Sequence, residues 1–237
     1  MGIDIIGKAL LDFQAGNYSE DIITYSSLEE KDVIPLHYLF RDYESMPSLE
    51  QEALKHCYGE VLDIGCGAGS HSLHLQRNGV DSTALDTSAG AIEVCRKRRL
   101  RKVVQANVMN YSDKKFDTLL MLMNGVGIVG NIKGLGIFLR HAANLLKPNG
   151  CILLDSSDII YMFETEEGLH DLSGNKKYYG EVEFSMHYKG EKSDIFEWLY
   201  VDFDTLRRAA QESGYNCELL FEGKHYDYLA KLSLELY

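Results

Sequence analysis

Three closely spaced glycines are the residues of this chain best suited to bringing a ligand against the main chain. Gly65, Gly67 and Gly69 alternate with larger residues in the run 64–70, Ile-Gly-Cys-Gly-Ala-Gly-Ser. Glycine lets the backbone turn sharply and lets a ligand approach closely. Residues 70–77 follow with helical periodicity, and a helix N-terminus offers free N–H groups and a positive dipole end. We therefore predict a ligand that places a negative or polar group at this turn.

Two aspartates and one serine indicate the class of ligand. The dinucleotide-binding pattern G-x-G-x-x-G needs glycine at position 70, where the chain has Ser70. Asp63, just before the turn, would repel a pyrophosphate but attract an ammonium group. S-adenosylmethionine has an ammonium group for Asp63 and a carboxylate for the helix N-terminus. Asp86, at the end of the next predicted strand, could accept both hydroxyls of a ribose, and ribose is common to NAD and S-adenosylmethionine.

The elements expected to position these residues alternate between strands and helices. Apolar runs separated by amphipathic segments predict β-α-β units and a parallel sheet. We predict strands at Glu60–Ile64, Val80–Asp86, Val103–Ala106, Phe116–Leu122 and Cys151–Asp155, and helices at Ser70–Arg77, Ser88–Lys97 and Leu135–Leu146. The run 147–150, Lys-Pro-Asn-Gly, is a helix stop signal.

Residues 1–58 are expected to form a helical cap that covers one end of the sheet. Ile3–Phe13 has the spacing of an amphipathic helix, and Ser48 with Gln51 has the spacing of a capping box. The remaining residues, 59–237, would form the sheet domain.

The C-terminal part adds a hairpin and a sheet edge. Residues 178–200 alternate apolar and polar side chains on both sides of the run 189–192, which predicts an antiparallel hairpin inside an insert at 156–200. A helix near Asp204–Ser213 and strands at Glu218–Phe221 and Tyr228–Leu236 complete the predicted elements.

The order of the motifs is similar to that of class I S-adenosylmethionine-dependent methyltransferases. The resemblance rests on VLDIGCGAGSHSLHL, VDSTALDTSAGAIEVCR, QANVMNY, FDTLLMLMNGVG and LLKPNGCILLD, which cover roughly residues 60–155. It implies a doubly wound, Rossmann-like α/β fold with seven strands, mostly parallel and ending in an antiparallel hairpin. It also implies that S-adenosyl-L-methionine lies across the carboxyl ends of the first four strands.

The resemblance also implies contacts to the cofactor by position. Gly65, Gly67 and Gly69 would lie against it, Asp63 would hold its amino group directly or through water, and Asp86 its ribose. The other matching positions are Cys66, Thr87, Asn107, Val108, Met123 and Asn124. Asn107 and Val108 would flank the adenine, and Met123 and Asn124 form the loop after the fourth strand. That loop lacks the Asn-Pro-Pro-Tyr pattern of enzymes that methylate nucleic-acid bases, so small-molecule methyltransferases resemble the chain most.

Few catalytic residues are expected, because methyl transfer from a sulfonium is a direct displacement that depends mainly on alignment. His71, in the first turn after the glycines, is the candidate for a general base, beside the more conservative interpretation that it merely touches cofactor or solvent. His74 could share its helix face, but no third ligand indicates a metal site. The loop 156–174 is rich in acidic and aromatic residues, which is typical of a solvated loop and also of a wall for a cationic substrate.

Composition limits the remaining classes of function. The 237 residues carry a formal net charge of -12, which argues against a nucleic-acid partner. We interpret the basic run 96–102 as a solvated helix end far from the cofactor. Five cysteines without a C-x-x-C pair predict reduced thiols and a cytoplasmic location. The longest uncharged run, Thr118 to Ile132, is shorter than the ~20 residues of a membrane-spanning helix, so we expect no membrane segment.

The favoured hypothesis is an enzyme that transfers a methyl group to an oxygen or nitrogen of a small molecule. One alternative is a sensor or scaffold that binds S-adenosylmethionine without turnover, with a homodimer formed through residues 178–200. The other is an NAD-dependent oxidoreductase, which Ser70 and Asp63 disfavour.

Overall fold

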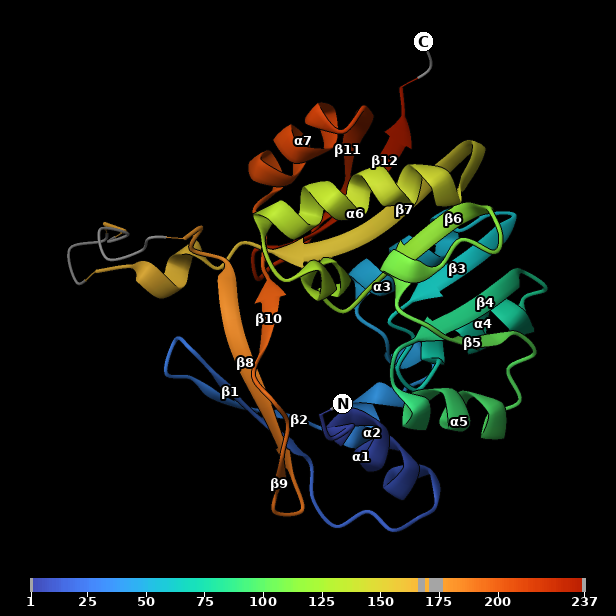
Figure 1. Ribbon diagram of the computed structural model, residues 1–237, viewed down its shortest axis with the longest axis vertical. Coiled ribbons are helices and arrows are strands. Elements are labelled where there is room, and N and C mark those ends of the chain that lie inside the picture. The colour runs from blue at the N-terminus through green and yellow to red at the C-terminus, as the bar shows by residue number, and fades with distance from the viewer. Residues whose placement is uncertain (1, 166–168, 171–176, 236–237) are drawn as a thin grey trace.

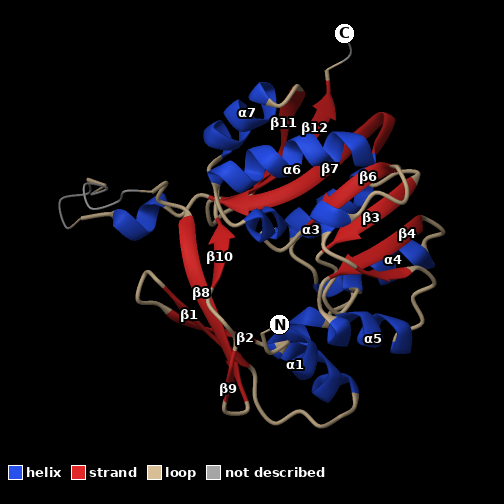
Figure 2. Cartoon of the chain, viewed as in Figure 1, coloured by secondary structure: helices blue, strands red, loops and turns tan. Residues whose placement is uncertain are grey.

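Two β-sheets meet in the computed structural model, which describes residues 2–165, 169–170 and 177–235 (Figures 1 and 2). The larger sheet has seven strands in the order β11-β12-β7-β6-β3-β4-β5. Five adjacent strands, β7 to β5 in this order, pair in parallel. β12 is antiparallel to both of its neighbours, so it alone of the seven runs in the opposite direction. The doubly wound fold with a C-terminal antiparallel hairpin is confirmed. The strands are β3 (Glu60–Ile64), β4 (Asp81–Asp86), β5 (Val103–Gln105), β6 (Phe116–Met121), β7 (Leu146–Ser157), β11 (Tyr215–Glu222) and β12 (Asp227–Leu234).

Helices cover both faces of this sheet. Apolar residues of α6 (Ile132–Leu145) and α7 (Phe203–Glu212) pack on one face in the largest core cluster. On the other face, α3 (Ser48–His56) and α4 (Ser70–Arg77) form a second cluster, and α5 (Ala89–Lys97) packs beside α4. Short 3-10 turns lie at Tyr43–Ser45, Val108–Asn110, Gly125–Val129 and Ile160–Phe163. The parallel strands therefore end at one shared edge, which Figure 1 shows turned toward the second sheet.

The second sheet combines two strands from the N-terminal part of the chain with three strands from its C-terminal part. It runs β10-β8-β1-β2, with β9 paired to β8. Its strands are β1 (Ile22–Ser26), β2 (Lys31–Ile34), β8 (Glu181–Tyr188), β9 (Glu191–Lys192) and β10 (Phe196–Leu199). The predicted hairpin in 178–200 is confirmed, because β8 pairs antiparallel with β9 and β10.

The expectation that residues 1–58 are purely helical is wrong. β1 and β2 form a hairpin, and β1 continues into β8, with Ile23 opposite His187. Five residues of β1 are too few for alternation to stand out, and the strand that completes its hydrogen bonds lies far along the chain. The division at residue 58 stays a prediction.

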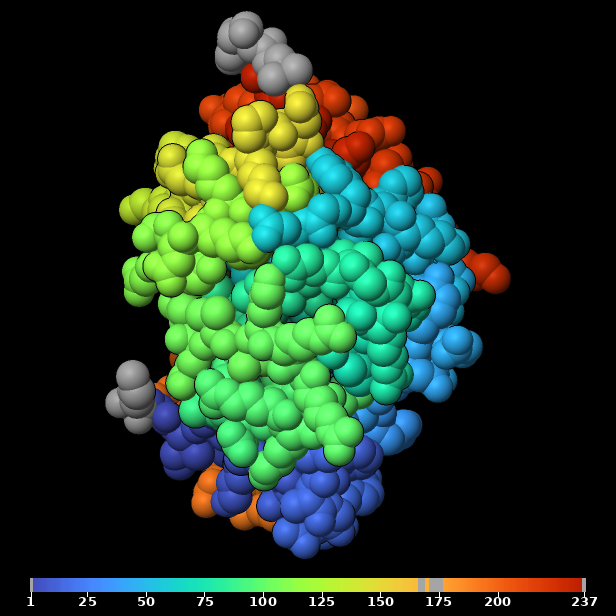
Figure 3. Space-filling view, turned by 90° about the vertical axis from the view of Figure 1, so that its right-hand side faces the viewer, coloured from blue at the N-terminus to red at the C-terminus, as the bar shows by residue number. Residues whose placement is uncertain are grey.

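Helix α1 (Ile5–Gln14) joins the second sheet to the main domain. Asp4 caps it and accepts hydrogen bonds from Ser88 Oγ (2.8 Å) and Gly90 N (3.2 Å) at the start of α5. A Cβ at Gly90 would lie 2.5 Å from the backbone of Gly7, so α1 and α5 need glycine where they meet. In Figure 3 the blue N-terminal residues lie directly below the green surface that includes α5.

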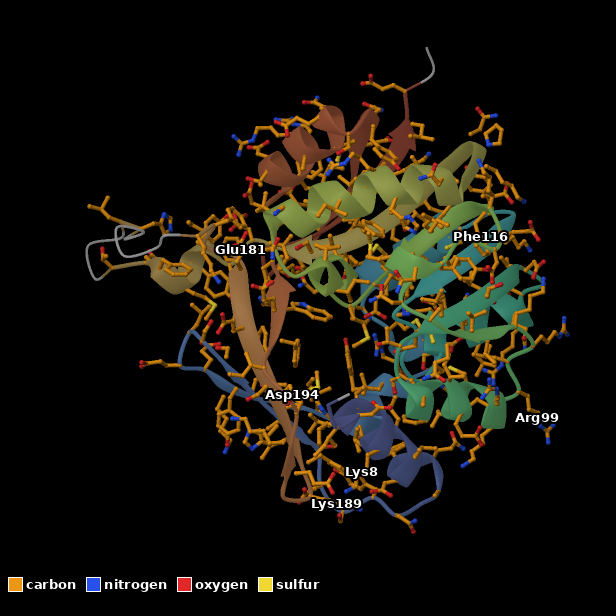
Figure 4. The ribbon with its side chains drawn as sticks, in the orientation of Figure 1. Lys8, Arg99, Phe116, Glu181, Lys189 and Asp194 are labelled. Carbon is orange, nitrogen blue, oxygen red and sulfur yellow. The ribbon has the colours of Figure 1, made fainter. Side chains whose placement is uncertain are left out.

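Charged contacts hold the other side of α1 against the β8–β9 turn. Lys8 Nζ lies 2.7 Å from Glu191 Oε1, and Lys189 Nζ lies 2.8 Å from Asp12 Oδ2. Figure 4 shows Lys8 and Lys189 close to this junction. The cap thus bridges the two sheets, together with the short helix α2 (Leu36–Leu39).

Three boundaries differ from the sequence prediction. Helix α6 begins at Ile132 because the Asn131 side chain accepts from Gly134 N and caps it there. Residues 147–150 belong to an irregular start of β7 and do not form a separate loop. The capping box is wrong: Ser48 is the first helical residue and makes no capping bond, while Gln51 donates to the carbonyls of Tyr43 and Met46.

Candidate functional site

The glycine-rich turn joins β3 to α4 at the carboxyl edge of the large sheet. Gly65, Gly67 and Gly69 all have positive φ, at 75°, 53° and 77°. A Cβ at Gly65 or Gly67 would meet nothing within 4 Å, so open space lies over these two residues. A Cβ at Gly69 would lie 2.5 Å from Leu100 Cδ1. Gly65 and Gly67 are therefore open to a ligand, whereas Gly69 serves the turn and the packing beneath it.

Asp86 ends β4 beside this turn. Its Oδ2 accepts from Gly67 N over 2.9 Å, and its Oδ1 accepts from Ser88 N over 2.8 Å. Burial raises the pKa of Asp86, while both hydrogen bonds favour its charged form. A carboxylate fixed at the rim of an open glycine turn fits a ribose with two hydroxyls. The exposed Thr87 follows, and its carbonyl accepts from Gln105 Nε2 over 3.3 Å.

Asp63 lies deeper in the same turn and is 2% exposed. Ser72 donates to its Oδ2 through the hydroxyl (2.7 Å) and the backbone N–H (3.2 Å), which ties β3 to α4. Burial raises the pKa of Asp63. Both of these bonds go to Oδ2, so Oδ1 keeps its lone pairs for an ammonium group or a bridging water.

The remaining predicted contacts lie on the loops after β5 and β6. Asn107 is exposed and its side chain accepts from Met109 N, while Val108 is buried. Met123 and Asn124, directly after β6, both have positive φ, at 66° and 55°. Two such non-glycine residues in succession are uncommon, and strain of this kind is concentrated at functional sites.

Cys66, also among the predicted contacts, is 6% exposed. Its Sγ lies 3.8 Å from Cys95 Sγ, below the glycine turn. The thiol therefore packs into the core, and only the backbone of Cys66 shares the turn with the two open glycines.

Asp155, at the end of β7, supports the strained loop after β6. Its Oδ1 accepts from Gly125 N over 3.0 Å, and the Asn124 N–H also favours the charged carboxylate. Asp155 is 8% exposed, and burial raises its pKa to about 6. The sequence analysis did not single out this residue, because an aspartate at the end of an apolar strand has no motif around it.

His71 belongs to a buried charge network. Its Nε2 lies 2.8 Å from Glu50 Oε2, and Arg41 Nη2 donates to both oxygens of Glu50. Arg41, Glu50 and His71 are 7%, 4% and 6% exposed. Burial opposes ionisation of Glu50, but the hydrogen bonds and charges of His71 and Arg41 outweigh it and hold the pKa of Glu50 below its usual value.

This network accounts for the burial of His71 and contains a buried ion pair that was not predicted from the sequence. His71 is not in contact with bulk solvent, and one ring nitrogen is held by Glu50. Glu50 lies between the buried apolar residues Leu49 and Ala53 on α3. An acidic residue on the apolar face of a helix was the available signal for a buried ion pair.

Aromatic side chains of the second sheet face the rest of the molecule. Phe184, Phe196 and Trp198 share one face of β8 and β10, since Phe184 pairs with Phe196 and Trp198 with Val182. The Trp198 ring packs on Gly127, where an added Cβ would lie 2.0 Å from Nε1. This face therefore rests against the loop after β6.

The acidic, aromatic loop 156–174 is described only in part. Asp158 Oδ1 accepts from the Tyr179 hydroxyl over 2.8 Å, and Tyr161 is 45% exposed and stacks on Tyr226. Glu166, Glu167 and Asp171 lie outside the described residues. Both the substrate-wall and the solvated-loop interpretations stay predictions.

The basic run 96–102 includes one residue with a structural role near the glycine turn. Arg98 Nη1 donates to Ala68 O (2.6 Å) and Ser70 Oγ (3.1 Å), and its guanidinium lies 5.1 Å from the Phe40 ring centroid. Arg96 and Arg99 are exposed. A surface cavity of about 450 Å³ opens between Arg98, the segment 40–44 and α4, and Gly65, Gly67 and Asp86 do not line it.

Two further findings concern the described residues alone. Within them, no helix has the length and apolar character needed to cross a bilayer. The same part of the chain contains no group of three or more His, Cys, Asp or Glu side chains that could hold a metal ion.

Comparison with known proteins identifies the family. A family profile described as "Methyltransferase domain" matches residues 61–150. A solved S-adenosylmethionine-dependent methyltransferase from Bacteroides fragilis, in complex with S-adenosyl-L-homocysteine, is 43% identical, with a TM-score of 0.92 over 98% of this chain and 95% of that one. The chain belongs to the family of S-adenosylmethionine-dependent methyltransferases, and the resemblance found in its motifs is confirmed.

Curated relatives match a smaller part. "Cypemycin N-terminal methyltransferase" of a Streptomyces species is 32% identical over 41% of this chain and 42% of its own length. "Ubiquinone biosynthesis O-methyltransferase" of Azorhizobium caulinodans is 30% identical over 40% of this chain and 39% of its own length. The chain thus spans about two fifths of the length of these relatives.

Proposed function

We propose that this protein catalyses methyl transfer from S-adenosylmethionine to an oxygen or nitrogen of a small molecule. The observation that carries the proposal is the open space over Gly65 and Gly67 beside the fixed carboxylate of Asp86. The names of the relatives, which include an O-methyltransferase and an N-terminal methyltransferase, support the reaction class.

Each predicted contact has a role in this proposal. Asp86 accepts the ribose hydroxyls, Oδ1 of Asp63 receives the amino group, and the N-terminus of α4 faces the carboxylate. The contacts to the adenine and to the methionine chain come from the loops after β4, β5 and β6, which carry Thr87, Asn107, Val108, Met123 and Asn124 at or near the same edge. Gly65, Cys66 and Gly67 contribute backbone, and Gly69 contributes the turn.

The bound cofactor supplies a methyl group on a positively charged sulfur. The acceptor's lone pair forms the new bond to carbon while the carbon–sulfur electron pair stays on sulfur. The protein's contribution is to align the two in line and to exclude water, for which the aromatic face of Phe184, Phe196 and Trp198 is suited. His71 is retained as a candidate general base, needed only where the acceptor must lose a proton.

A cytoplasmic location and a homodimer are part of the proposal. The five cysteines are all free, which fits a reducing compartment. Strand β10 lies at an end of the described order of the second sheet, so a second copy could pair through residues 178–200. Sedimentation of the purified protein tests the proposed homodimer. A monomeric protein at micromolar concentration would rule it out.

Calorimetry tests the proposed cofactor first. S-adenosylmethionine and S-adenosylhomocysteine should bind, and NAD should not. A panel of amine, phenol and carboxylate acceptors with labelled cofactor then tests turnover. Binding without transfer to any acceptor would favour the sensor alternative, and binding of NAD alone would overturn the assignment.

A further inference from the structure

Three buried carboxylates gather at the carboxyl edge of the large sheet with too few cations to balance them. Asp63 is the last but one residue of β3, Asp155 lies two residues before the end of β7, and Glu50 lies on α3. They are 2%, 8% and 4% exposed. Arg41 is the one permanent cation of this cluster, and His71 is the other basic member. With His71 either neutral or protonated, the carboxylates outnumber the cations.

The members of this cluster lie on one face of the large sheet. Asp63 pairs with Leu120 of β6, and Leu120 pairs with Leu153, two residues before Asp155 on β7. Helix α3, which carries Glu50, packs against Leu120 and Leu153 on that face.

Glu50 and His71 both influence the ionisation of Asp155, and His71 also influences that of Asp63. Tyr38 of α2 lies beside the same group, since the Arg41 guanidinium carbon is 3.9 Å from its ring centroid. Burial raises the pKa of Tyr38, and the charges of Glu50 and Asp155 raise it further. Uncompensated charge in a protein interior is costly, so a site of this kind favours a ligand that brings positive charge.

The order of the strands places the buried carboxylates at the sulfur and methionine end of the proposed cofactor. Asp86 on β4 marks the ribose, and the loop after β5 would take the adenine. The sulfur links the ribose to the methionine chain. The sulfur and the methionine chain therefore extend from the ribose away from the adenine, that is, from β4 toward β3, β6 and β7. Asp63 and Asp155 lie near the carboxyl ends of the outer two of these three strands, and the loop 123–125 follows the middle strand, β6.

The cofactor changes charge at this end during the reaction. S-adenosylmethionine carries an ammonium, a carboxylate and a sulfonium, and has a net positive charge. The product keeps the ammonium and the carboxylate, but its sulfur is a neutral thioether. A negative field at the sulfur therefore distinguishes the two molecules, whereas contacts to ribose, adenine and amino group do not.

We propose that the buried carboxylates of Asp155 and Glu50 make the protein prefer the sulfonium cofactor over its neutral product, with Asp155 as the residue that determines this specificity; Asp63 holds the amino group, which both molecules have. The inference rests on the proposed function, since it requires both molecules to bind. The proposal also gives these carboxylates a role in product release. Once methyl transfer has made the sulfur neutral, they no longer attract it, and S-adenosylhomocysteine is bound less tightly.

Asp155→Asn tests the proposal with little change in shape. Asparagine keeps an oxygen that can accept from Gly125 N, so the loop after β6 retains its support. At pH 7.5 the variant should bind S-adenosylmethionine about tenfold more weakly, the order expected for one partly screened charge at several ångströms. Its affinity for S-adenosylhomocysteine should change by less than about threefold, so the ratio of the two dissociation constants is the readout.

Asp86→Asn is the matched control. It also neutralises one aspartate at the same edge, which is half-buried, but this carboxylate faces the ribose, which both molecules have. Both affinities should fall by a similar factor, so their ratio should stay as in the wild type. A ratio that changes equally in the two variants would overturn the proposal, as would an unchanged ratio in Asp155→Asn.

The wild-type protein provides a second test that needs no variant. Between pH 7.5 and 5.5 Asp155 takes up a proton, and the preference for S-adenosylmethionine should decline toward that of Asp155→Asn. The groups facing Asp155 are Tyr38, Glu50, His71 and, beyond them, Arg41 and Asp63. A pH-independent ratio would contradict the inference. Failure of the proposed function is distinguishable, because then either neither molecule binds the wild type or both bind and no acceptor is methylated.

Discussion

The buried pair of Arg41 and Glu50 offers a quantitative test of how the cap is held on the main domain. Their side chains are 4% and 5% exposed, and His71 adds a hydrogen bond of 2.8 Å to the same carboxylate. Replacing Glu50 by leucine would leave the Arg41 guanidinium buried without its counter-ion. Removing one partner of a buried ion pair costs about 3–5 kcal/mol. The unpaired Nε2 of His71 adds roughly 1–3 kcal/mol.

A double-mutant cycle separates these contributions. Arg41→Met together with Glu50→Leu removes both charges and keeps similar volumes, so the double variant should be destabilised much less than the sum of the single variants. We expect a coupling of at least about 2 kcal/mol in the free energy of unfolding, measured by urea denaturation with equal m-values. Glu52→Leu on the same helix is the control. Glu52 is partly exposed, and its contacts with Lys55 and His56 are worth less than about 1 kcal/mol.

Two results would refute this reasoning. A loss below about 1 kcal/mol for Glu50→Leu would mean that water reaches Arg41 and that the pair is not truly desolvated. A coupling near zero would mean that Arg41 and Glu50 stabilise the fold independently. Either result would also weaken the assignment of a buried excess of negative charge at the cofactor edge.

Three further predictions follow from single residues. Asp86→Ala should weaken binding of S-adenosylhomocysteine by about 100-fold in calorimetry, because two hydrogen bonds to a charged acceptor are lost at roughly 1.5 kcal/mol each; a change below threefold would contradict its role. Burial raises the pKa of Asp155 from 3.8 to about 6, so its carboxyl binds a proton more tightly in the folded state than in the unfolded state. The free energy of unfolding of the ligand-free protein should therefore fall as pH rises from about 4 to 6, by about 3 kcal/mol in total. Asp155→Asn should flatten this dependence in urea titrations, and an unaltered pH profile would count against the burial of its charge. Gly69→Ala should lower the free energy of unfolding by more than about 1 kcal/mol, since φ is 77° at this position and the new Cβ would meet Leu100 and Cys95. A variant as stable as the wild type in thermal unfolding would show that the turn can relax.

Local patterns were sufficient for the large sheet. Each of its β-α-β units has its own apolar run, its own periodic helix and its own turn, all within a few tens of residues. The glycine turn and Asp86 could be predicted for the same reason. Both lie at strand ends within one such unit, and a strand end fixes the edge of the sheet at which a side chain stands.

The second sheet and the charge network depended on contacts between distant segments. The residues 22–26 become a strand because β8 supplies their hydrogen bonds, and no feature of five residues encodes that partner. Glu50 is tolerable on a buried helix face only because Arg41 and His71 meet it there, from a loop and from another helix.

The sequence by itself therefore determined the fold class, the cofactor family and the position of the glycine turn. Tertiary structure decided which acids are buried, which are paired and which keep a negative charge at the edge of the sheet. The physical reason is that propensity and periodicity are properties of neighbouring residues, whereas desolvation and charge balance depend on everything that packs around a group once the chain has folded.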